Sequence, residues 1–360
     1  MKVNGQQYQS IWFEESDNSV NIIDQTRLPH RFEIITLNTL QDACHAIESM
    51  QVRGAPLIGV AAAYGIYLAL LEDPQQLAVA MDKLAATRPT AVNLRWGLDR
   101  VNAALRHTVV EKRVEVALQE AQAMEREDSV ICAQIGEHGT ALLQEIWNEK
   151  HDKSKPLQVL THCNAGALAT VDWGTALSVI YKTAESGVPL HVWVDETRPR
   201  NQGASLTCWE LAQHDIAHTL IVDNAGGHLM QHGQVDCCVV GSDRTTINGD
   251  VCNKIGTYLK ALAAFDNDVP FFVALPVSSI DFTLSEGLKE IPIEQRDAEE
   301  VSHLSGVDEK GELSKIRLCP EGTAISNFGF DVTPARLISK IITEKGVCDA
   351  QHSQLQRLRS

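Results

Sequence analysis

The residues best suited to chemistry lie in residues 241–258, which read GSDRTTINGDVCNKIGTY. An apolar run stops at Gly241, and Asp243 follows it in a polar turn. This order predicts a buried strand that delivers a carboxylate to a loop, with a helix from about residue 251 onward. Ligands of open α/β sheets bind at the carboxyl ends of the strands, so Asp243 is a candidate catalytic residue. The alternative is an aspartate that only caps the following turn.

A second candidate is Cys163, which directly follows another predicted strand that ends at His162. Neighbours on an extended strand point to opposite faces, so we do not expect His162 to activate the thiol, and a hydrogen-bonding role suits it better. Cys163 also opens a small-residue turn into the predicted helix GALATVDWGTALSVIYK. A helix N-terminus lowers the pKa of a thiol and makes it more reactive. The alternative is a buried structural cysteine.

Two arginines each precede a predicted helix. Arg53 and Gly54 lead into PLIGVAAAYGIYLALL, which is apolar almost all round, so we expect a buried helix that is short for a membrane span. Arg88, in the sequence TRPT, leads into AVNLRWGLDRVNAAL. Free backbone N–H groups at a helix start, beside a guanidinium, form a phosphate site. We expect the two helix entrances to converge on one anion; the alternative for Arg53 is a surface ion pair.

Polar clusters follow each candidate strand in the second half of the chain. The strands are expected at 157–162, 190–195, 219–223, 237–240 and 271–275, and the clusters read THCNAG, DETRPRNQG, DNAGG, GSDR and PVSS. Strands that alternate with helical segments indicate a parallel, doubly wound sheet. In such a sheet the five clusters lie on one edge and form one cleft.

The remaining pattern divides the chain into two parts. Residues 1 to about 40 alternate apolar and polar, which predicts a small antiparallel sheet, and helices follow, those within 111–148 having charged faces. The polar, proline-ended stretch 148–156 is the expected boundary. We therefore expect an N-terminal sheet-plus-helices domain at 1–150 that contributes phosphate-binding residues, and a catalytic parallel-sheet domain at 151–360. The last helix is expected at about 334–345.

Composition excludes several classes of function. With 360 residues and a net charge of −16, the chain lacks the clustered basic surface that nucleic acids or anionic membranes require. The polar N-terminus does not resemble a secretion signal, so a cytoplasmic protein is expected. The nine cysteines form no CxxC pair or metal-like spacing and are expected to be free thiols. This spacing gives no reason to expect a metal site, and because no G-x-G-x-x-G or Walker loop follows a strand, neither a dinucleotide nor ATP is expected.

Taken together, the motifs resemble the 5-methylthioribose-1-phosphate isomerase family of the methionine salvage pathway. The matching stretches are RGAPLIGVAAAYG, RPTAVNL, THCNAGALAT, DETRPRNQGASLTCWEL, DNAGGHLM, GSDRTTINGDVCNKIGTY and DVTP. Few families join all of these in that order. Three features depart from the family: a short segment before RPTAVNL, the lead ISNFGFDVTP, and Arg200-Asn201 before Gln202.

The resemblance implies a role for each matching position. The catalytic cysteine falls on Cys163 and the proton-donating aspartate on Asp243. Substrate contacts fall on Arg53, Gly54, Ala55, Arg88, Gln202, Asn253 and Lys254. Arg95 suits the arginine role less well than Arg88, because it lies inside the predicted helix. The family fold is a small N-terminal domain followed by a Rossmann-like domain, usually a homodimer, with no cofactor.

The implied reaction converts an aldose 1-phosphate into a ketose 1-phosphate. Our hypothesis is that Asp243, with a pKa raised by the apolar strand behind it, protonates the ring oxygen. Cys163 would take the C2 hydrogen as a base or stabilise the charge that develops, and a hydride shift and a proton transfer are both compatible with the sequence. Alternatives are an isomerase of 5-deoxyribose 1-phosphate or ribose 1,5-bisphosphate, a non-catalytic regulatory subunit of the same fold, and a Cys-dependent hydrolase.

Overall fold

Alternating apolar and polar residues near the N-terminus form a three-stranded antiparallel sheet in the computed structural model, which describes residues 1–89 and 91–359. The strands are β3 (Ile11–Glu14), β4 (Ser19–Ile23) and β5 (Ile34–Leu37), preceded by the short pair β1 (Lys2–Val3) and β2 (Gln6–Gln7). Ile11, Val20 and Ile22 are fully buried on the face that meets the helices. The predicted N-terminal sheet is confirmed.

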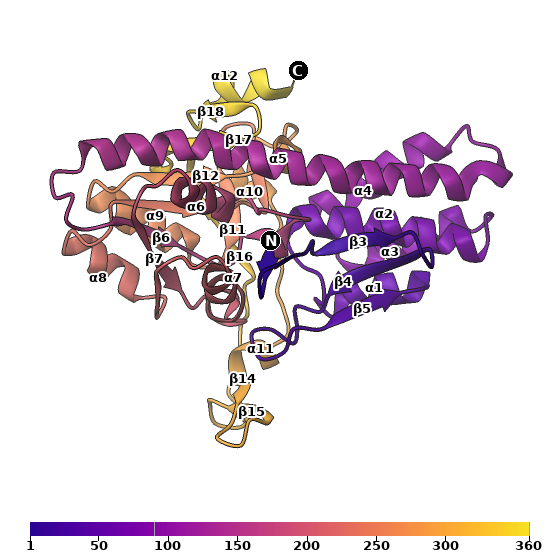
Figure 1. Cartoon of the computed structure of the whole chain (residues 1–360), viewed down its shortest axis with the longest axis horizontal. Helices are drawn as coiled ribbons and strands as arrows, with labels where there is room; N and C mark the ends of the chain where they lie inside the picture. Colours follow the sequence, from indigo (N-terminus) through magenta and orange to yellow (C-terminus); the bar gives the residue numbers. More distant parts are fainter. Residues whose placement is uncertain (90, 360) are drawn as a thin grey trace.

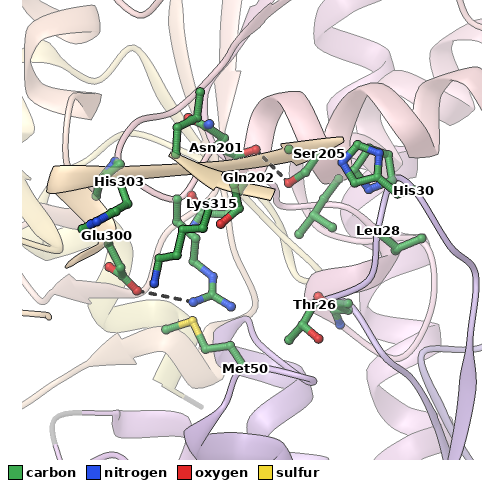
Figure 2. A pocket seen from close by; sticks show the side chains of 18 of the residues that line it. Thr26, Leu28, His30, Met50, Asn201, Gln202, Ser205, Glu300, His303 and Lys315 are labelled. Atoms are coloured by element: carbon green, nitrogen blue, oxygen red, sulfur yellow. Dashed lines mark hydrogen bonds and ion pairs between the residues drawn. The ribbon is translucent and has the colours of Figure 1, made fainter. Parts of the chain in front are cut away.

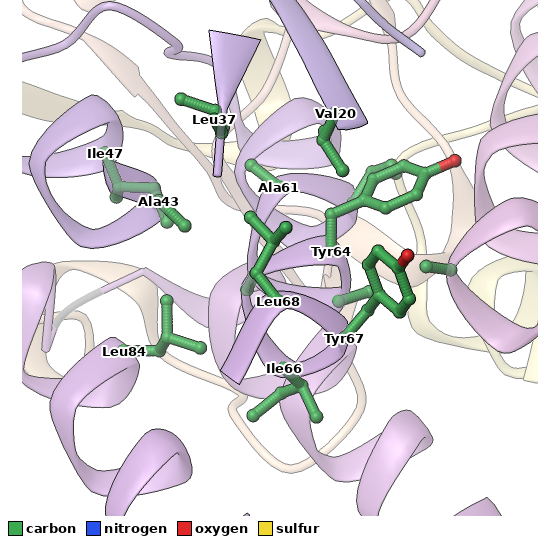
Figure 3. Close-up of a cluster of buried hydrophobic side chains, with 14 of the residues drawn as sticks. Val20, Leu37, Ala43, Ile47, Ala61, Tyr64, Ile66, Tyr67, Leu68 and Leu84 are labelled. Atoms are coloured by element: carbon green, nitrogen blue, oxygen red, sulfur yellow. The ribbon is translucent and has the colours of Figure 1, made fainter. Parts of the chain in front are cut away.

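Helices pack around one central, fully apolar helix in this part of the chain. They are α1 (Leu40–Glu48), α2 (Ala55–Glu72), α3 (Leu77–Thr87), α4 (Val92–Leu105) and α5 (Arg113–Glu149), with the 3-10 turn η1 (Val110–Lys112) before α5. Figure 3 shows Tyr64, Leu68 and neighbouring α2 side chains surrounded by Val20 and Leu37 of the sheet and by Leu84 of α3. By length and composition α2 passes for a membrane span, but 78% of it is buried inside the protein.

Helix α5 joins the two halves of the molecule. We expected several helices here, but the structure forms one helix of 37 residues, which runs across the whole width of the molecule (Figure 1). Its first half buries Ala117 and Ala121 in the core around α2, and its second half buries Ile135 and Leu143 in the core beneath the large sheet. The expected boundary at 148–156 falls where α5 ends and the first strand of that sheet begins.

A seven-stranded sheet organises the second half. Its order is β18-β17-β12-β9-β6-β7-β8, and the neighbouring strands are parallel except for β18. The strands are β6 (Leu157–Thr161), β7 (Leu190–Asp195), β8 (His218–Ile221), β9 (Cys237–Val240), β12 (Phe271–Ala274), β17 (Lys340–Thr343) and β18 (Gly346–Cys348). All five predicted strands are present, and the predicted fold class is confirmed. Cys237 and Cys238 face the separate cores on the two sides of the sheet.

Two expected helices are wrong. Val251–Lys254 is strand β11, and the helix α9 (Thr257–Asp266) begins only after Gly256. The expected last helix at 334–345 is instead a 3-10 turn, η5 (Ala335–Leu337), followed by β17 and β18. In both places buried β-branched residues gain hydrogen bonds from a neighbouring strand, which local periodicity does not reveal.

Smaller elements complete the fold around the strand ends. A second sheet has the order β13-β10-β11-β16, with β10 (Arg244–Thr246), β13 (Ile280–Asp281) and β16 (Phe330–Thr333). The hairpin of β14 (His303–Val307) and β15 (Leu313–Arg317) projects from the body, as seen at the bottom of Figure 1. The short helices are α6 (Ala176–Glu185), α7 (Cys208–Gln213), α8 (Ala225–Gln231), α10 (Gly287–Glu290), α11 (Glu299–Ser302) and α12 (His352–Leu355). The short turns are η2 (Ala167–Ala169), the π turn η3 (Gly203–Thr207), η4 (Val277–Ser279) and η6 (Gln356–Arg359).

The crossing of α2 and α4 supplies a test of this packing. A Cβ on Gly97 of α4 would lie 2.5 Å from the carbonyl oxygen of Gly59 on α2. Overpacking a core costs about 1–3 kcal/mol, so we expect Gly97→Ala to lower the thermal midpoint by several degrees although alanine is the better helix former. Asn102→Ala, on the exposed face of the same helix, is the control and should leave the midpoint unchanged. Equal midpoints for the two variants would contradict the close approach.

Candidate active site

A cavity of about 70 Å³ lies between the start of α2 and the ends of β6 and β9. Its lining includes every site residue predicted from the sequence, namely Arg53, Gly54, Ala55, Arg88, Cys163, Gln202, Asp243, Asn253 and Lys254. These residues come from α2, from the end of α3 and from four segments of the second half. The structure therefore brings the predicted set together around one space.

Cys163 follows β6, and two threonine hydroxyl groups form hydrogen bonds with its backbone. Its N–H donates to Thr197 Oγ1 at 2.8 Å, and its carbonyl accepts from Thr207 Oγ1 at 2.7 Å. The helix expected to begin here is absent: between Cys163 and the start of α6, the turn η2 is the only helical element among the described residues. The expected lowering of the thiol pKa is therefore wrong. Burial raises the pKa of Cys163, and the nearby charges of Arg53 and Lys254 oppose that rise.

Asp243 lies in the short connection between β9 and β10. Its backbone N–H donates to the carbonyl of Cys252 at 3.0 Å, which fixes the residue against β11. Burial raises the pKa of its carboxyl group, while Lys254, Arg88 and Arg53 lower it. A carboxyl group that holds its proton to higher pH than usual can serve as a general acid, which agrees with the expectation from the sequence.

Arg53 and Gly54 directly precede α2, and Gly54 is its N-cap. The guanidinium of Arg53 is buried, and its Nη2 donates to the backbone oxygen of Asn164 at 2.9 Å and to the Asn164 side-chain oxygen. Gly54 has φ 96°, and a Cβ there would lie 2.4 Å from the carbonyl oxygen of Ala169. Only glycine fits this close approach, which sets the helix N-terminus against the loop that follows Cys163.

Arg88 reaches the cavity from a different place than expected. It is the C-terminal cap of α3, and α4 begins at Val92, so it does not stand at the start of α4. The residue Thr90 of the predicted entrance lies outside the described residues. Arg88 Nη2 lies 3.3 Å from Glu294 Oε2. Arg95 is exposed on α4 and does not line the cavity, which agrees with the choice of Arg88.

Three further polar residues line the cavity. Gln202 is buried, and its Oε1 has no hydrogen-bond partner among the described residues. Asn253 Nδ2 donates to Thr257 Oγ1 at 3.0 Å, and Lys254 Nζ lies 5.0 Å from the centre of the Phe330 ring. Burial lowers the pKa of Lys254, and Cys163 and Asp243 oppose that shift. These groups can offer hydrogen bonds to a polar ligand and a positive charge to an anionic one.

His162 has the hydrogen-bonding role expected of it. Its Nδ1 lies 2.8 Å from Asp195 Oδ2 and its Nε2 lies 2.8 Å from the carbonyl of Ile255, so the ring ties β6 to β7 and to the turn before α9. His162, Asp195 and Asp223 lie close enough to hold a metal ion. Lys260 Nζ, however, lies 3.2 Å from Asp195 Oδ2 and donates to the Asp223 carbonyl. The ammonium group of Lys260 therefore occupies the place beside these carboxylates where a metal ion would supply positive charge.

A larger cavity of about 420 Å³ adjoins the first and shares Met50, Arg53 and Gln202 with it. In Figure 2, Glu300 and Lys315 face Met50 across this space. Arg200, one of the departures from the family pattern, lines this larger cavity, and its Nη1 lies 3.3 Å from Glu300 Oε1. This wider space is the approach to the small cavity.

Sequence reasoning missed residues that support the predicted ones. Asn164 accepts a hydrogen bond from Arg53, and Glu294 forms an ion pair with Arg88. Glu210 on α7 accepts a hydrogen bond from Asn164. Asn164 stands in the quoted motif THCNAG, and Glu210 in CWEL, but neither motif shows what the side chain contacts. Glu294 lies in an irregular segment with no pattern that could have indicated it.

Comparison with known proteins agrees with the site. The model of the Initiation factor 2 subunit family matches residues 51–350. A methylthioribose-1-phosphate isomerase from Methylorubrum extorquens is 57% identical, covering 99% of this chain and 98% of that protein.

Two solved structures have the same fold. The 5-methylthioribose 1-phosphate isomerase from Pyrococcus horikoshii OT3 superposes with a TM-score of 0.83 at 36% identity, covering 98% of this chain and 96% of that one. The translation initiation factor eIF-2B, subunit delta, from A. fulgidus superposes with a TM-score of 0.78 at 40% identity, covering 95% and 96%. The resemblance expected from the motifs is confirmed, and the chain belongs to the Initiation factor 2 subunit family.

Proposed function

We propose that this chain is an aldose–ketose isomerase that converts 5-methylthio-α-D-ribose 1-phosphate into 5-methylthio-D-ribulose 1-phosphate in methionine salvage. The observation that carries the proposal is that Cys163 and Asp243 line one cavity together with Arg53 and Arg88. The name of the 57% identical relative supports the same reaction and substrate. The enzyme acts on a small phosphorylated sugar and needs no cofactor for this chemistry.

The phosphate is held by the arginines and by the start of α2. Arg53 supplies a buried guanidinium, and the α2 N-terminus at Gly54 and Ala55 supplies backbone N–H groups and the positive end of the helix dipole. Arg88 adds a second guanidinium after exchanging Glu294 for the phosphate. Gln202, Asn253 and Lys254 hold the sugar hydroxyls or the phosphate.

Asp243 protonates the ring oxygen. The phosphate on C1 prevents spontaneous opening to a free aldehyde, so the ring oxygen must receive a proton as its bond to C1 breaks. Burial raises the pKa of Asp243, so its carboxyl group holds this proton to a higher pH than an ordinary aspartic acid does. The carboxylate that remains can then accept the proton from the C2 hydroxyl group.

The hydrogen on C2 moves to C1 as a hydride. Burial raises the pKa of Cys163, so its thiol is neutral and is a poor acceptor for a proton bound to carbon. A direct shift from C2 to C1 needs no base for the migrating hydrogen. It leaves a CH₂ group at C1 and, once the Asp243 carboxylate has accepted the proton of the C2 hydroxyl group, a carbonyl at C2. In this scheme Cys163 packs against C1 and C2, excludes water and stabilises the developing charge.

We propose further that the protein is a cytoplasmic homodimer, as the family resemblance implies. Leu220 on the edge strand β8 and the following Val222 are exposed, and apolar side chains at a sheet edge favour association. Sedimentation at the mass of a single chain would contradict the dimer.

A coupled assay with purified protein tests the reaction. We expect turnover of the methylthio sugar 1-phosphate, with a higher kcat/KM than for 5-deoxyribose 1-phosphate or ribose 1,5-bisphosphate. A higher kcat/KM for one of the other two sugars would reassign the substrate. No turnover of any of them would favour the alternative of a non-catalytic regulatory subunit; the A. fulgidus protein of the same fold is named a translation initiation factor subunit.

The acid role predicts the behaviour of Asp243→Asn. This variant should lose kcat by about a hundredfold or more, since a positioned acid contributes about that much. In the wild type, kcat/KM should fall as pH rises through the raised pKa of Asp243, because only the protonated carboxyl group can donate. Asp266→Asn, an exposed carboxylate on α9, is the matched control and should keep normal kinetics. If Asp243→Asn kept nearly the full wild-type kcat, Asp243 could not be the general acid.

The hydride shift predicts the isotope pattern of the product. When the reaction runs in deuterated water, we expect no solvent deuterium on C1, because the migrating hydrogen never leaves the substrate. Mass spectrometry or proton NMR of the ketose phosphate measures this. Deuterium incorporated at C1 would show that a base removes the C2 hydrogen, and would assign that role to Cys163.

A further inference from the structure

Glu210 is a buried carboxylate that lies behind the loop carrying Cys163 and does not line the small cavity. It belongs to α7 and is 1% exposed. Its oxygens accept from Asn164 Nδ2 at 2.8 Å, the N–H groups of Ala167 at 2.8 Å and Leu168 at 3.3 Å, and Tyr181 Oη at 2.9 Å. A buried carboxylate is costly unless donors surround it, and these four donors come mostly from the one loop.

The orientation of the Asn164 amide follows from this network. Thr207 Oγ1 donates its proton to the carbonyl of Cys163, so it can only accept from Asn164. Glu210 is also an acceptor. The amide nitrogen of Asn164 must therefore point toward Thr207 and Glu210, and its oxygen must point the other way.

The oxygen of Asn164 meets Arg53. Nη2 of Arg53 donates to this side-chain oxygen and to the backbone oxygen of the same residue. A flipped amide would turn its own N–H groups toward the guanidinium, and two donors would then face each other in a buried space. In the part of the chain that the structure describes, Arg53 Nε has no hydrogen-bond partner, and the two contacts of Nη2 to Asn164 hold the guanidinium.

We propose that Glu210 is a positioning residue for phosphate binding: it orients the Asn164 amide, whose oxygen holds the Arg53 guanidinium at the start of α2. The inference rests on the proposed function, in which Arg53 binds the substrate phosphate. Glu210 also places a negative charge behind Arg53, which helps to keep a guanidinium charged in a buried site. Glu210 acts through Asn164 and touches no reacting atom.

The variant Glu210→Gln tests this role because it keeps the size of the side chain but removes the charge and replaces one accepting oxygen with an NH₂ group, so residue 210 no longer has two accepting oxygens for its four donors. A hydrogen bond to a charged group contributes about 1.5–3 kcal/mol, so KM for the sugar phosphate should rise about tenfold or more. The chemistry at Asp243 is not touched, so kcat should change by less than about threefold. Inorganic phosphate bound in the cavity should protect Cys163 from an alkylating reagent, which peptide mass spectrometry measures. In Glu210→Gln this protection should need a higher phosphate concentration than in the wild type, by about the same factor as the rise in KM.

A double variant separates positioning from simple loss of stability. In Glu210→Gln with Asn164→Asp, the introduced amide donates to the introduced carboxylate, which again accepts from Arg53. We expect KM and phosphate protection to return to within about threefold of wild type. Tyr181→Phe is the control: it removes one hydrogen bond from Glu210 and leaves the Asn164 contact, so the thermal midpoint should fall while KM stays normal.

The outcomes distinguish the two proposals. An unchanged KM in Glu210→Gln, a loss confined to kcat, or a KM that the double variant fails to restore would overturn the positioning role. If the wild-type protein isomerises none of the three sugars, the proposed function fails instead. The phosphate-protection experiment still tests the positioning role in that case, because its readout does not require turnover.

Discussion

The buried guanidinium of Arg53 is the interaction on which the rest of the site depends. It reaches from the start of α2, in the helical half of the molecule, to Asn164 in the loop after β6. The contact is possible because Gly54 brings the helix N-terminus against the backbone of Ala169, where a side chain would not fit. One close approach thus joins a helix N-terminus to the carboxyl end of a parallel strand, two places that each favour anionic or polar ligands.

Charge compensation explains why so many ionisable groups can be buried here. Burial lowers the pKa of Arg53 and of Lys254 and raises the pKa of Asp243 and of Cys163, which in each case favours the neutral form. Each cation lies near an anionic or potentially anionic group, so the opposing charges limit those shifts. The result is a site with three cationic side chains, Arg53, Arg88 and Lys254, around one carboxyl group whose pKa is raised by burial. In the proposed mechanism, phosphate binding and acid catalysis therefore come from the same cluster of charges.

The same fold occurs in an isomerase and in a translation initiation factor, so the fold alone does not decide the function. Function has to be argued from the side chains of the small cavity and from what they can do together. In this chain the cavity has a thiol, a carboxyl group and two guanidinium groups on its wall. It also adjoins a wider space partly walled by hairpin β14–β15, through which a small molecule can reach it.

The sequence by itself determined the central sheet, the buried helix α2 and the residues that gather at the strand ends, because alternation, apolar runs and short motifs are local signals. It did not determine that residues 251–254 and 340–343 form strands, since the neighbouring strands that bond to them are distant in sequence. Nor could it give the pKa of Cys163, because the expected helix depended on local pattern while burial depends on the whole fold. The contacts of Asn164 and Glu210 were decided by tertiary structure alone: a hydrogen bond between residues 46 positions apart leaves no mark in either local sequence.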